Sequence, residues 1–256
     1  MNPSAGQTPI YLDQHALFVG TTGSGKSTRM IKELAWRLGQ TRNIDPNSYK
    51  IVLVDTKPIS YGQSDELGHY SFTGGRIYRD WKTIDLNNEE SRLIIYRPTE
   101  DLVSPEEFDP FFDKILSYRR TVTRTAMVNG KPVTSTQASP LPVTLIIDEL
   151  IDVFSSKDRR SEYMQGFTKF LTQGRSSLQT LWILTQYPTY IDPAIKRNVS
   201  ANFVFELPDE NDRRIMAGIL GFKEITKAIP DQHGFWYRNS AIPATRRSPI
   251  YYSGAA

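Results

Sequence analysis

A short segment near the start of the chain carries the residue types that bind nucleotide phosphates. Residues 20–27 read Gly-Thr-Thr-Gly-Ser-Gly-Lys-Ser, after the apolar run 16–19 and before a helix-like stretch, 28–38. A glycine-rich turn lets successive backbone N–H groups point at an anion, and a lysine at this spacing neutralises the terminal phosphates. The segment therefore predicts a nucleoside triphosphate site in a loop between a strand and a helix.

Each position of this loop has an expected role. We expect Lys26 to bind the terminal phosphates and the Ser27 hydroxyl to bind Mg²⁺. The alternative, an ordinary Gly/Ser loop, is disfavoured because a strand precedes the segment and a helix follows it. The other residues expected to bind the nucleotide are Gly20, Thr21, Thr22, Gly23, Ser24, Gly25 and Thr28.

Two adjacent carboxylates follow a second apolar run, 143–147. An aspartate at the carboxyl end of a strand beside a phosphate loop can hold Mg²⁺, which is the role expected for Asp148. Glu149 would then polarise a water molecule for attack on the γ-phosphate. The alternative is a strand followed by an acidic helix start, because carboxylates favour helix N-termini.

Strand-like and helix-like segments alternate along the chain, which predicts an α/β fold with a mainly parallel central sheet and helices on both faces. Several strand candidates are continuous apolar runs, as expected for strands covered on both sides. The expected strands are 16–19, 50–55, 92–96, 143–147, 180–185, 202–206 and 234–237, and the expected helices are 26–38, 105–118, 159–172, 193–199 and 210–220.

Length and composition indicate a single domain spanning residues 1–256. The apolar runs are too short to cross a bilayer, and the N-terminal residues lack the features of a secretory signal, so we expect a soluble cytoplasmic chain. The absence of cysteine excludes disulfides and thiolate metal sites. The net charge of +3 is too small to establish a nucleic-acid partner.

A basic insertion is expected near residues 119–140. It contains Arg119, Arg120, Arg124 and Lys131, no acidic residue, and many Thr, Ser, Gly and Pro residues that oppose helix. We expect an exposed loop or hairpin, which either contacts DNA phosphates or is a solvated insertion. The tail, 248–256, is expected either to be flexible or to pack on a neighbouring molecule.

Further motifs follow the acidic pair in a fixed order. The chain reads Gln-Gly-Arg-Ser-Ser at 173–177, Thr-Gln-Tyr-Pro at 185–188, Ile-Lys-Arg-Asn-Val at 195–199 and Asp-Arg-Arg-Ile at 212–215. With the phosphate loop and the acidic pair, this series resembles the FtsK/HerA superfamily of ring-forming, DNA-pumping ATPases. The resemblance extends from about His15 to Tyr237, and it implies a RecA-like (ASCE) P-loop NTPase fold.

The resemblance also implies roles for three further residues and a quaternary structure. Gln186 matches the family's γ-phosphate sensor, Arg175 matches its trans-acting arginine finger, and Arg214 matches a second sensor or an interface residue. For Arg175, a cation at a helix C-terminus is the alternative interpretation. The family binds ATP with Mg²⁺ between the subunits of a homo-oligomeric ring, here expected to be a hexamer.

Among such ATPases, a single domain without membrane spans or a DNA-reading module is most similar to the genome-packaging ATPases of membrane-containing icosahedral viruses. We therefore expect translocation of double-stranded DNA into a preformed capsid, in the host cytoplasm or at the packaging vertex of the virion. A capsid vertex protein or a membrane protein would be a further partner. The alternatives are a conjugation or plasmid-transfer translocase, a secretion or pilus ATPase, and a nucleotide-gated scaffold with little turnover.

Overall fold

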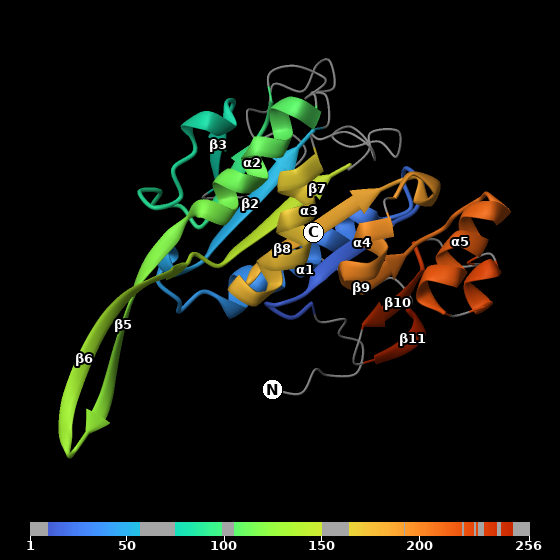
Figure 1. Ribbon diagram of the computed structural model, residues 1–256. Helices are drawn as coiled ribbons and strands as arrows, with labels where there is room; N and C mark the ends of the chain where they lie inside the picture. Colours follow the sequence, from blue (N-terminus) through green and yellow to red (C-terminus); the bar gives the residue numbers. More distant parts are fainter. Residues whose placement is uncertain are drawn as a thin grey trace, which may run out of the picture.

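Nine strands form one sheet in the part of the chain that this computed structural model describes (Figure 1). The structure describes residues 10–56, 75–98, 105–149, 164–191, 193–221, 223–227, 229, 233–239 and 242–247. The strand order is β11-β10-β9-β1-β8-β7-β2-β4-β3, and β10 is antiparallel to both of its neighbours while the other pairs are parallel. The strands are β1 (His15–Val19), β2 (Lys50–Asp55), β3 (Arg76–Tyr78), β4 (Leu93–Tyr96), β7 (Val143–Asp148), β8 (Gln179–Thr185), β9 (Val199–Val204), β10 (Phe235–Asn239) and β11 (Ile242–Arg247).

Helices cover both faces of the sheet, which confirms the predicted architecture. Neighbouring residues of a strand enter opposite cores: Leu17 packs with Phe112 and Phe170, whereas Phe18 packs with Met30. No described helix is long and apolar enough to cross a bilayer. The helices are α1 (Lys26–Gln40), α2 (Pro105–Ser117), α3 (Gln165–Gln173), α4 (Pro193–Asn198) and α5 (Glu210–Leu220), with 3-10 turns at Pro46–Ser48, Trp81–Thr83, Gly174–Ser177, Pro188–Tyr190 and Lys223–Thr226.

The structure corrects several expected boundaries. Strand β9 begins three residues before the expected strand 202–206, because α4 passes directly into it. The predictions omitted β3, which has three residues, and β11, which is rich in arginine and has little apolar character. Helix α3 begins at Gln165, and residues 159–163 of the expected helix lie outside the described residues, as does the tail 248–256.

The basic insertion is a long antiparallel hairpin of β5 (Arg119–Val128) and β6 (Lys131–Pro140). It forms a sheet of its own and projects away from the body of the protein (Figure 1). Asn129 and Gly130 have φ angles of 50° and 75°, as a two-residue type I′ turn requires. The expectation of an exposed loop or hairpin is therefore confirmed as a hairpin, which we call the arm.

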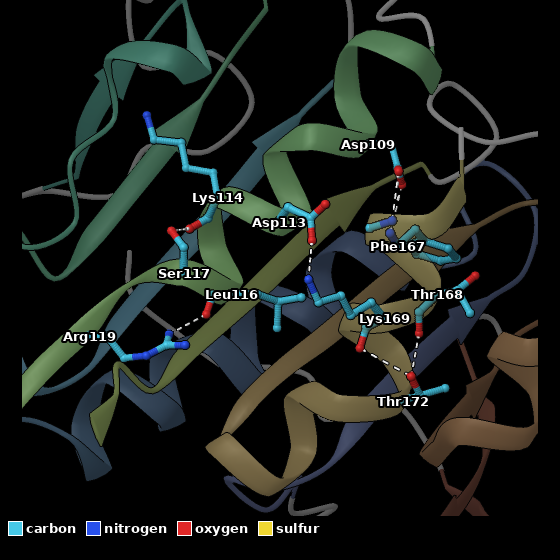
Figure 2. Close-up of polar contacts among 11 residues, drawn as sticks. Asp109, Asp113, Lys114, Leu116, Ser117, Arg119, Phe167, Thr168, Lys169 and Thr172 are labelled. Carbon is cyan, nitrogen blue, oxygen red and sulfur yellow. Dashed lines mark hydrogen bonds and ion pairs between the residues drawn. The ribbon is translucent and has the colours of Figure 1, made fainter. Parts of the chain in front are cut away.

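Helix α2, which leads into the arm, is fixed to α3 by polar contacts along their interface (Figure 2). Asp109 accepts hydrogen bonds from the backbone N–H groups of Gly166 and Phe167, both at 2.8 Å, and so caps the N-terminus of α3. Burial raises the pKa of Asp109, and these two bonds oppose the rise. A Cβ on Gly166 would lie 2.5 Å from the Asp109 carbonyl oxygen, so only glycine permits this approach. Lys169 and Asp113 add an exposed ion pair at 2.9 Å.

A buried histidine joins three elements at the amino end of the sheet. Leu181 of β8 donates its backbone N–H to Nδ1 of His15 at 2.9 Å, so Nε2 carries the proton and donates to the Leu171 carbonyl oxygen at 3.0 Å. Burial lowers the pKa of His15 to about 4, helped by the positive charge of Arg175 and opposed by the bond to Leu171. The neutral ring is therefore the form that the fold requires.

This histidine predicts a loss of stability in mild acid. The unfolded chain binds a proton at His15 near pH 6.5, whereas the folded chain resists it until about pH 4. The contribution is present above pH 6.5 and is lost as the pH falls toward 4, by about 3 kcal/mol. The free energy of unfolding in urea, compared between the wild type and His15→Gln, should show a gap that narrows by that amount from pH 7 to pH 4. A gap that stays constant with pH would contradict the assignment.

Candidate nucleotide-binding site

The phosphate loop joins β1 to α1 at the carboxyl edge of the parallel strands. Its conformation depends on glycine: a Cβ on Gly20 would lie 2.6 Å from Cβ of Phe205, and Gly25 has a φ of 101°. Gly25 caps the N-terminus of α1, where no side chain caps the helix and the first turn holds no acidic residue. The hydroxyl of Ser24 is buried and has no hydrogen-bond partner among the described residues. These features fit a bound phosphate, because helix N-termini and orphaned donors attract anions.

Lys26 lies folded against the same loop. Its Nζ donates to the carbonyl oxygens of Gly20 at 2.6 Å and Thr21 at 2.8 Å, and the side chain is largely buried. The loop is tied in turn to the neighbouring strand ends, since Gly20 N–H donates to the Thr185 carbonyl and Thr21 N–H to the Glu206 carbonyl. The ammonium group is thus positioned at the centre of the loop, where the terminal phosphates are expected.

The predicted acidic pair and the predicted sensor meet beside the loop. Asp148 is the last residue of β7, Glu149 follows it, and both are buried. Oε1 of Glu149 accepts the backbone N–H of Gln186 at 3.3 Å, and Oε1 of Gln186 accepts the Thr22 hydroxyl at 2.8 Å. A chain of hydrogen bonds therefore links the phosphate loop, the end of β8 and the end of β7.

Glu149 has an unusual backbone conformation. Its φ of 84° lies in the left-handed region, which costs a residue with a Cβ about 1–3 kcal/mol. Backbone strain of this kind is concentrated at active sites, where it fixes the direction of a side chain. The observed hydrogen bond to the Gln186 N–H shows that direction: the Glu149 carboxylate turns toward the end of β8.

A buried ion pair supports Asp148 from the next strand. Asp55 lies opposite Asp148 in the β2–β7 register. Oδ2 of Asp55 accepts two hydrogen bonds from the Arg97 guanidinium, from Nε at 3.1 Å and from Nη2 at 2.6 Å. Thr56 donates its hydroxyl to the Asp148 carbonyl at 2.6 Å. The sequence analysis missed Arg97, although it directly follows a predicted strand, which is the same signal that identified Asp148.

His233 also lies close to the loop and was not predicted. Its Cβ lies 3.3 Å from the position that a Cβ on Gly25 would take, so it packs against the N-terminus of α1. It has a φ of 61°, and its buried Nδ1 has no hydrogen-bond partner among the described residues. No sequence motif distinguishes this position, because His233 meets Gly25 only through the tertiary fold and the two residues are far apart in sequence.

Neither of the two predicted catalytic arginines is hydrogen-bonded to the loop or the acidic pair in the described part of the chain. Arg175 precedes β8 and Gln186 follows it, so the seven-residue strand holds them about 20 Å apart at opposite edges of the sheet. Nε of the exposed Arg175 donates to the Asp13 carbonyl at 3.1 Å. Arg214 lies on α5 in an exposed ion pair with Glu210 at 2.6 Å. The role of Arg175 as a trans-acting finger and that of Arg214 as a second sensor or interface residue remain predictions.

No protein-family model and no curated protein matches this sequence. The fold does match solved structures, among them the genome packaging NTPase B204 from Sulfolobus turreted icosahedral virus 2 in complex with AMP. That match has a TM-score of 0.64 and 15% identity, and it covers 94% of this chain and 100% of that chain. The chain has the fold of a P-loop NTPase.

The same P-loop NTPase fold occurs in two larger proteins. The pCW3 conjugation coupling protein TcpA matches with a TM-score of 0.54 and 16% identity, over 95% of this chain and 62% of that chain. EssC (ATPases 2 and 3) from Geobacillus thermodenitrificans matches with a TM-score of 0.54 and 14% identity, over 93% and 40%. The predicted fold is confirmed, and the matches agree with the resemblance read from the sequence. B204 has also been solved with AMPPCP and with ATP-gammaS.

The Asp55–Arg97 pair makes the stability of the site testable. Arg97→Met removes the guanidinium that pairs with the buried Asp55 carboxylate, which should cost about 3–5 kcal/mol in the free energy of unfolding. The double variant Asp55→Leu/Arg97→Met removes both charges and should recover most of that loss. Urea unfolding of the two variants and the wild type measures both quantities. Equal losses in the single and double variants would show that packing, not charge, dominates there.

Proposed function

We propose that this protein is an ATP-hydrolysing motor that moves double-stranded DNA, acting in viral genome packaging. One observation carries the proposal: the phosphate loop, Asp148, Glu149 and Gln186 come from distant parts of the sequence and meet at one edge of the sheet. The match to the full length of a viral genome packaging NTPase supports it.

The residues of the site fit ATP with Mg²⁺. The loop N–H groups and Lys26 would hold the phosphates, while the Ser27 hydroxyl and the Asp148 carboxylate would hold the metal. Magnesium bound to a nucleotide takes few protein ligands, usually one or two carboxylates or hydroxyls beside the phosphate oxygens. When bound, the ion neutralises charge on the β- and γ-phosphates.

Glu149 would act as general base and Gln186 as the positioning residue of the attacking water. The strained backbone and the bond from the Gln186 N–H hold the Glu149 carboxylate in one orientation, which lowers the entropic cost of the step. A water between the two side chains would give a proton to Glu149 as its oxygen attacks the γ-phosphorus, while the bond from that phosphorus to the β–γ bridging oxygen breaks and ADP leaves with the bonding electrons. Since Gln186 also bonds to Thr22, its position reports the state of the loop.

A neighbouring subunit would complete the site. In the ring-forming ATPases that the sequence resembles the nucleotide lies between subunits, and a cation that stabilises the transferring phosphoryl group would here come from another copy. Arg175 is exposed, and we propose it as this finger, with Arg214 as a second sensor or interface residue. The assembly would be a ring, a hexamer in our proposal, in the host cytoplasm or at a capsid or membrane vertex.

A conjugation or secretion motor is the second candidate, because TcpA and EssC match 95% and 93% of this chain and B204 matches 94%. Stimulation of ATP hydrolysis by duplex DNA favours packaging or conjugation over secretion. A nucleotide-gated scaffold with little turnover is the third candidate, and it is excluded if the wild type releases phosphate over many turnovers much faster than Glu149→Gln does.

Replacing the proposed base separates binding from chemistry. Glu149→Gln keeps the shape and removes the basic oxygen, so it should lower the rate of ATP hydrolysis about 10²- to 10⁴-fold while ATP binding stays unchanged. Phosphate release and equilibrium binding of a fluorescent ATP analogue measure the two effects. Lys26→Ala is the matched variant in which binding itself should fail. Hydrolysis by Glu149→Gln at the wild-type rate would contradict the role.

Mixed assemblies test the trans arginine. Arg175→Ala should bind ATP normally and hydrolyse it at least about 10³-fold more slowly. Lys26→Ala should be inactive for a different reason: Arg175 is intact, but the lysine that binds the terminal phosphates is missing. Mixing the two variants should restore part of the activity, since Arg175 of one subunit can serve the site of its neighbour. No recovery in mixtures that form rings would argue for a structural role.

A further inference from the structure

The arm carries the whole positive excess of the chain. The protein has 31 Lys and Arg against 28 Asp and Glu, and four of these cations, with no acidic residue, lie between residues 119 and 140. The other 27 cations do not exceed the acidic residues. A hairpin that projects from the body with this charge attracts a polyanion, because basic clusters without acidic neighbours concentrate the electrostatic field.

The four cations have two different environments. Arg119 donates Nη1 to the carbonyl oxygens of Leu116 at 2.6 Å and Tyr118 at 3.0 Å, at the C-terminus of α2 (Figure 2), and Arg120 donates Nη1 to the Ser48 carbonyl at 3.0 Å. These two guanidinium groups fasten the base of the arm to the body. Arg124 and Lys131 lie farther out, are exposed, and have no side-chain partner among the described residues.

Strand alternation places the outer cations on one side of the arm. Side chains point alternately to the two faces, and cross-strand partners share a face. The pairs Arg124–Ser135 and Val128–Lys131 are four residues apart along β5, so Arg124 and Lys131 lie on the same face, about 13 Å apart. We call this the cationic face. The opposite face, which we call the threonine face, carries Thr121, Thr123, Thr125, Thr134 and Thr136.

We propose that the cationic face of the arm holds the phosphate backbone of duplex DNA. This inference rests on the proposed function and deepens it, because it names the element that grips the DNA. A two-stranded ribbon fits the major groove, which is about 12 Å wide. Arg124 and Lys131 would reach phosphates, while hydroxyl and amide groups such as those of Ser135 and Gln137 donate along the rest of the face.

The tip of the arm carries exposed apolar side chains, and these are compatible with binding to DNA. Met127, Val128 and Val133 are 69%, 50% and 49% exposed. Apolar side chains at the end of a DNA-binding arm contact thymine methyl groups or base steps. The exposed large apolar residues of the arm are confined to its tip, whereas most other side chains along its length of about 30 Å are polar. A long polar ribbon fits a duplex better than the interior of a lipid layer, which would leave its hydroxyl groups unsatisfied.

The test compares two double variants that remove the same charge. Arg124→Gln/Lys131→Gln removes the outer cations of the arm, and Arg42→Gln/Lys223→Gln removes two exposed cations of the body. Duplex binding is measured with a mixed-sequence duplex longer than the arm, across a range of salt concentrations, together with basal and duplex-stimulated ATP hydrolysis. The arm variant should bind roughly 10- to 100-fold more weakly, and its salt slope should fall by about 2. The body variant should resemble the wild type, and basal hydrolysis should be unchanged in both.

Each contrary outcome has a distinct meaning. If the wild type binds duplex DNA and the arm variant binds it equally well, the arm does not bind the DNA backbone, and the translocase proposal stands. If the wild type hydrolyses ATP but binds no duplex, both the arm inference and DNA translocation fail, and the ATPase remains. Two further results would overturn the inference if the arm variant also keeps full duplex binding. Binding of the wild type to vesicles of phosphatidylcholine and phosphatidylserine would indicate a membrane as the partner of the arm. A change in oligomeric mass in Met127→Ser/Val128→Ser would indicate a second copy of the chain.

Discussion

The parallel pairing of β7 with β2 and β8 is the constraint on which the site depends. Parallel strands end at the same edge, so residues that follow β1, β2, β4, β7 and β8 are brought together whatever their distance in sequence. Register then decides the fine geometry. Asp148 lies opposite Asp55 on one side and Leu184 on the other, which leaves Glu149 next to the Gln186 backbone. A slip of one residue in either pairing would turn the acidic side chains to the other face.

The carboxyl and amino ends of the parallel strands therefore hold different functional groups. The carboxyl edge holds the loop, the acidic pair and the ion pair of Asp55 with Arg97. The amino edge holds His15, Arg175 and the base of the arm. The arm runs directly into β7 through β6, so the element proposed to hold DNA and the strand that ends in Asp148 are nearly continuous in the chain. Strand β7 therefore gives a direct covalent route from the arm to Asp148.

Much of the site was predictable because its signals are local. A loop of fixed spacing, or an acidic pair after an apolar run, shows its chemistry within a few residues, and the chain places both as expected. Arg97 and His233 were missed because each becomes meaningful only through a contact with a distant segment. The hairpin geometry of the arm was only partly predictable. Its Asn-Gly turn is a local signal, but the separation of its cations into anchors and exposed groups depends on carbonyl oxygens of the body, such as that of Ser48.

The left-handed backbone of Glu149 implies a trade between stability and activity. Any residue with a Cβ that replaces it inherits the strain, whereas glycine relieves it and also removes the carboxylate. A chain selected for thermal stability alone would therefore drift toward glycine at this position and lose the proposed base. Selection for hydrolysis would maintain a non-glycine residue there. The free-energy cost of the left-handed backbone at this position is then explained by catalysis and not by the stability of the fold.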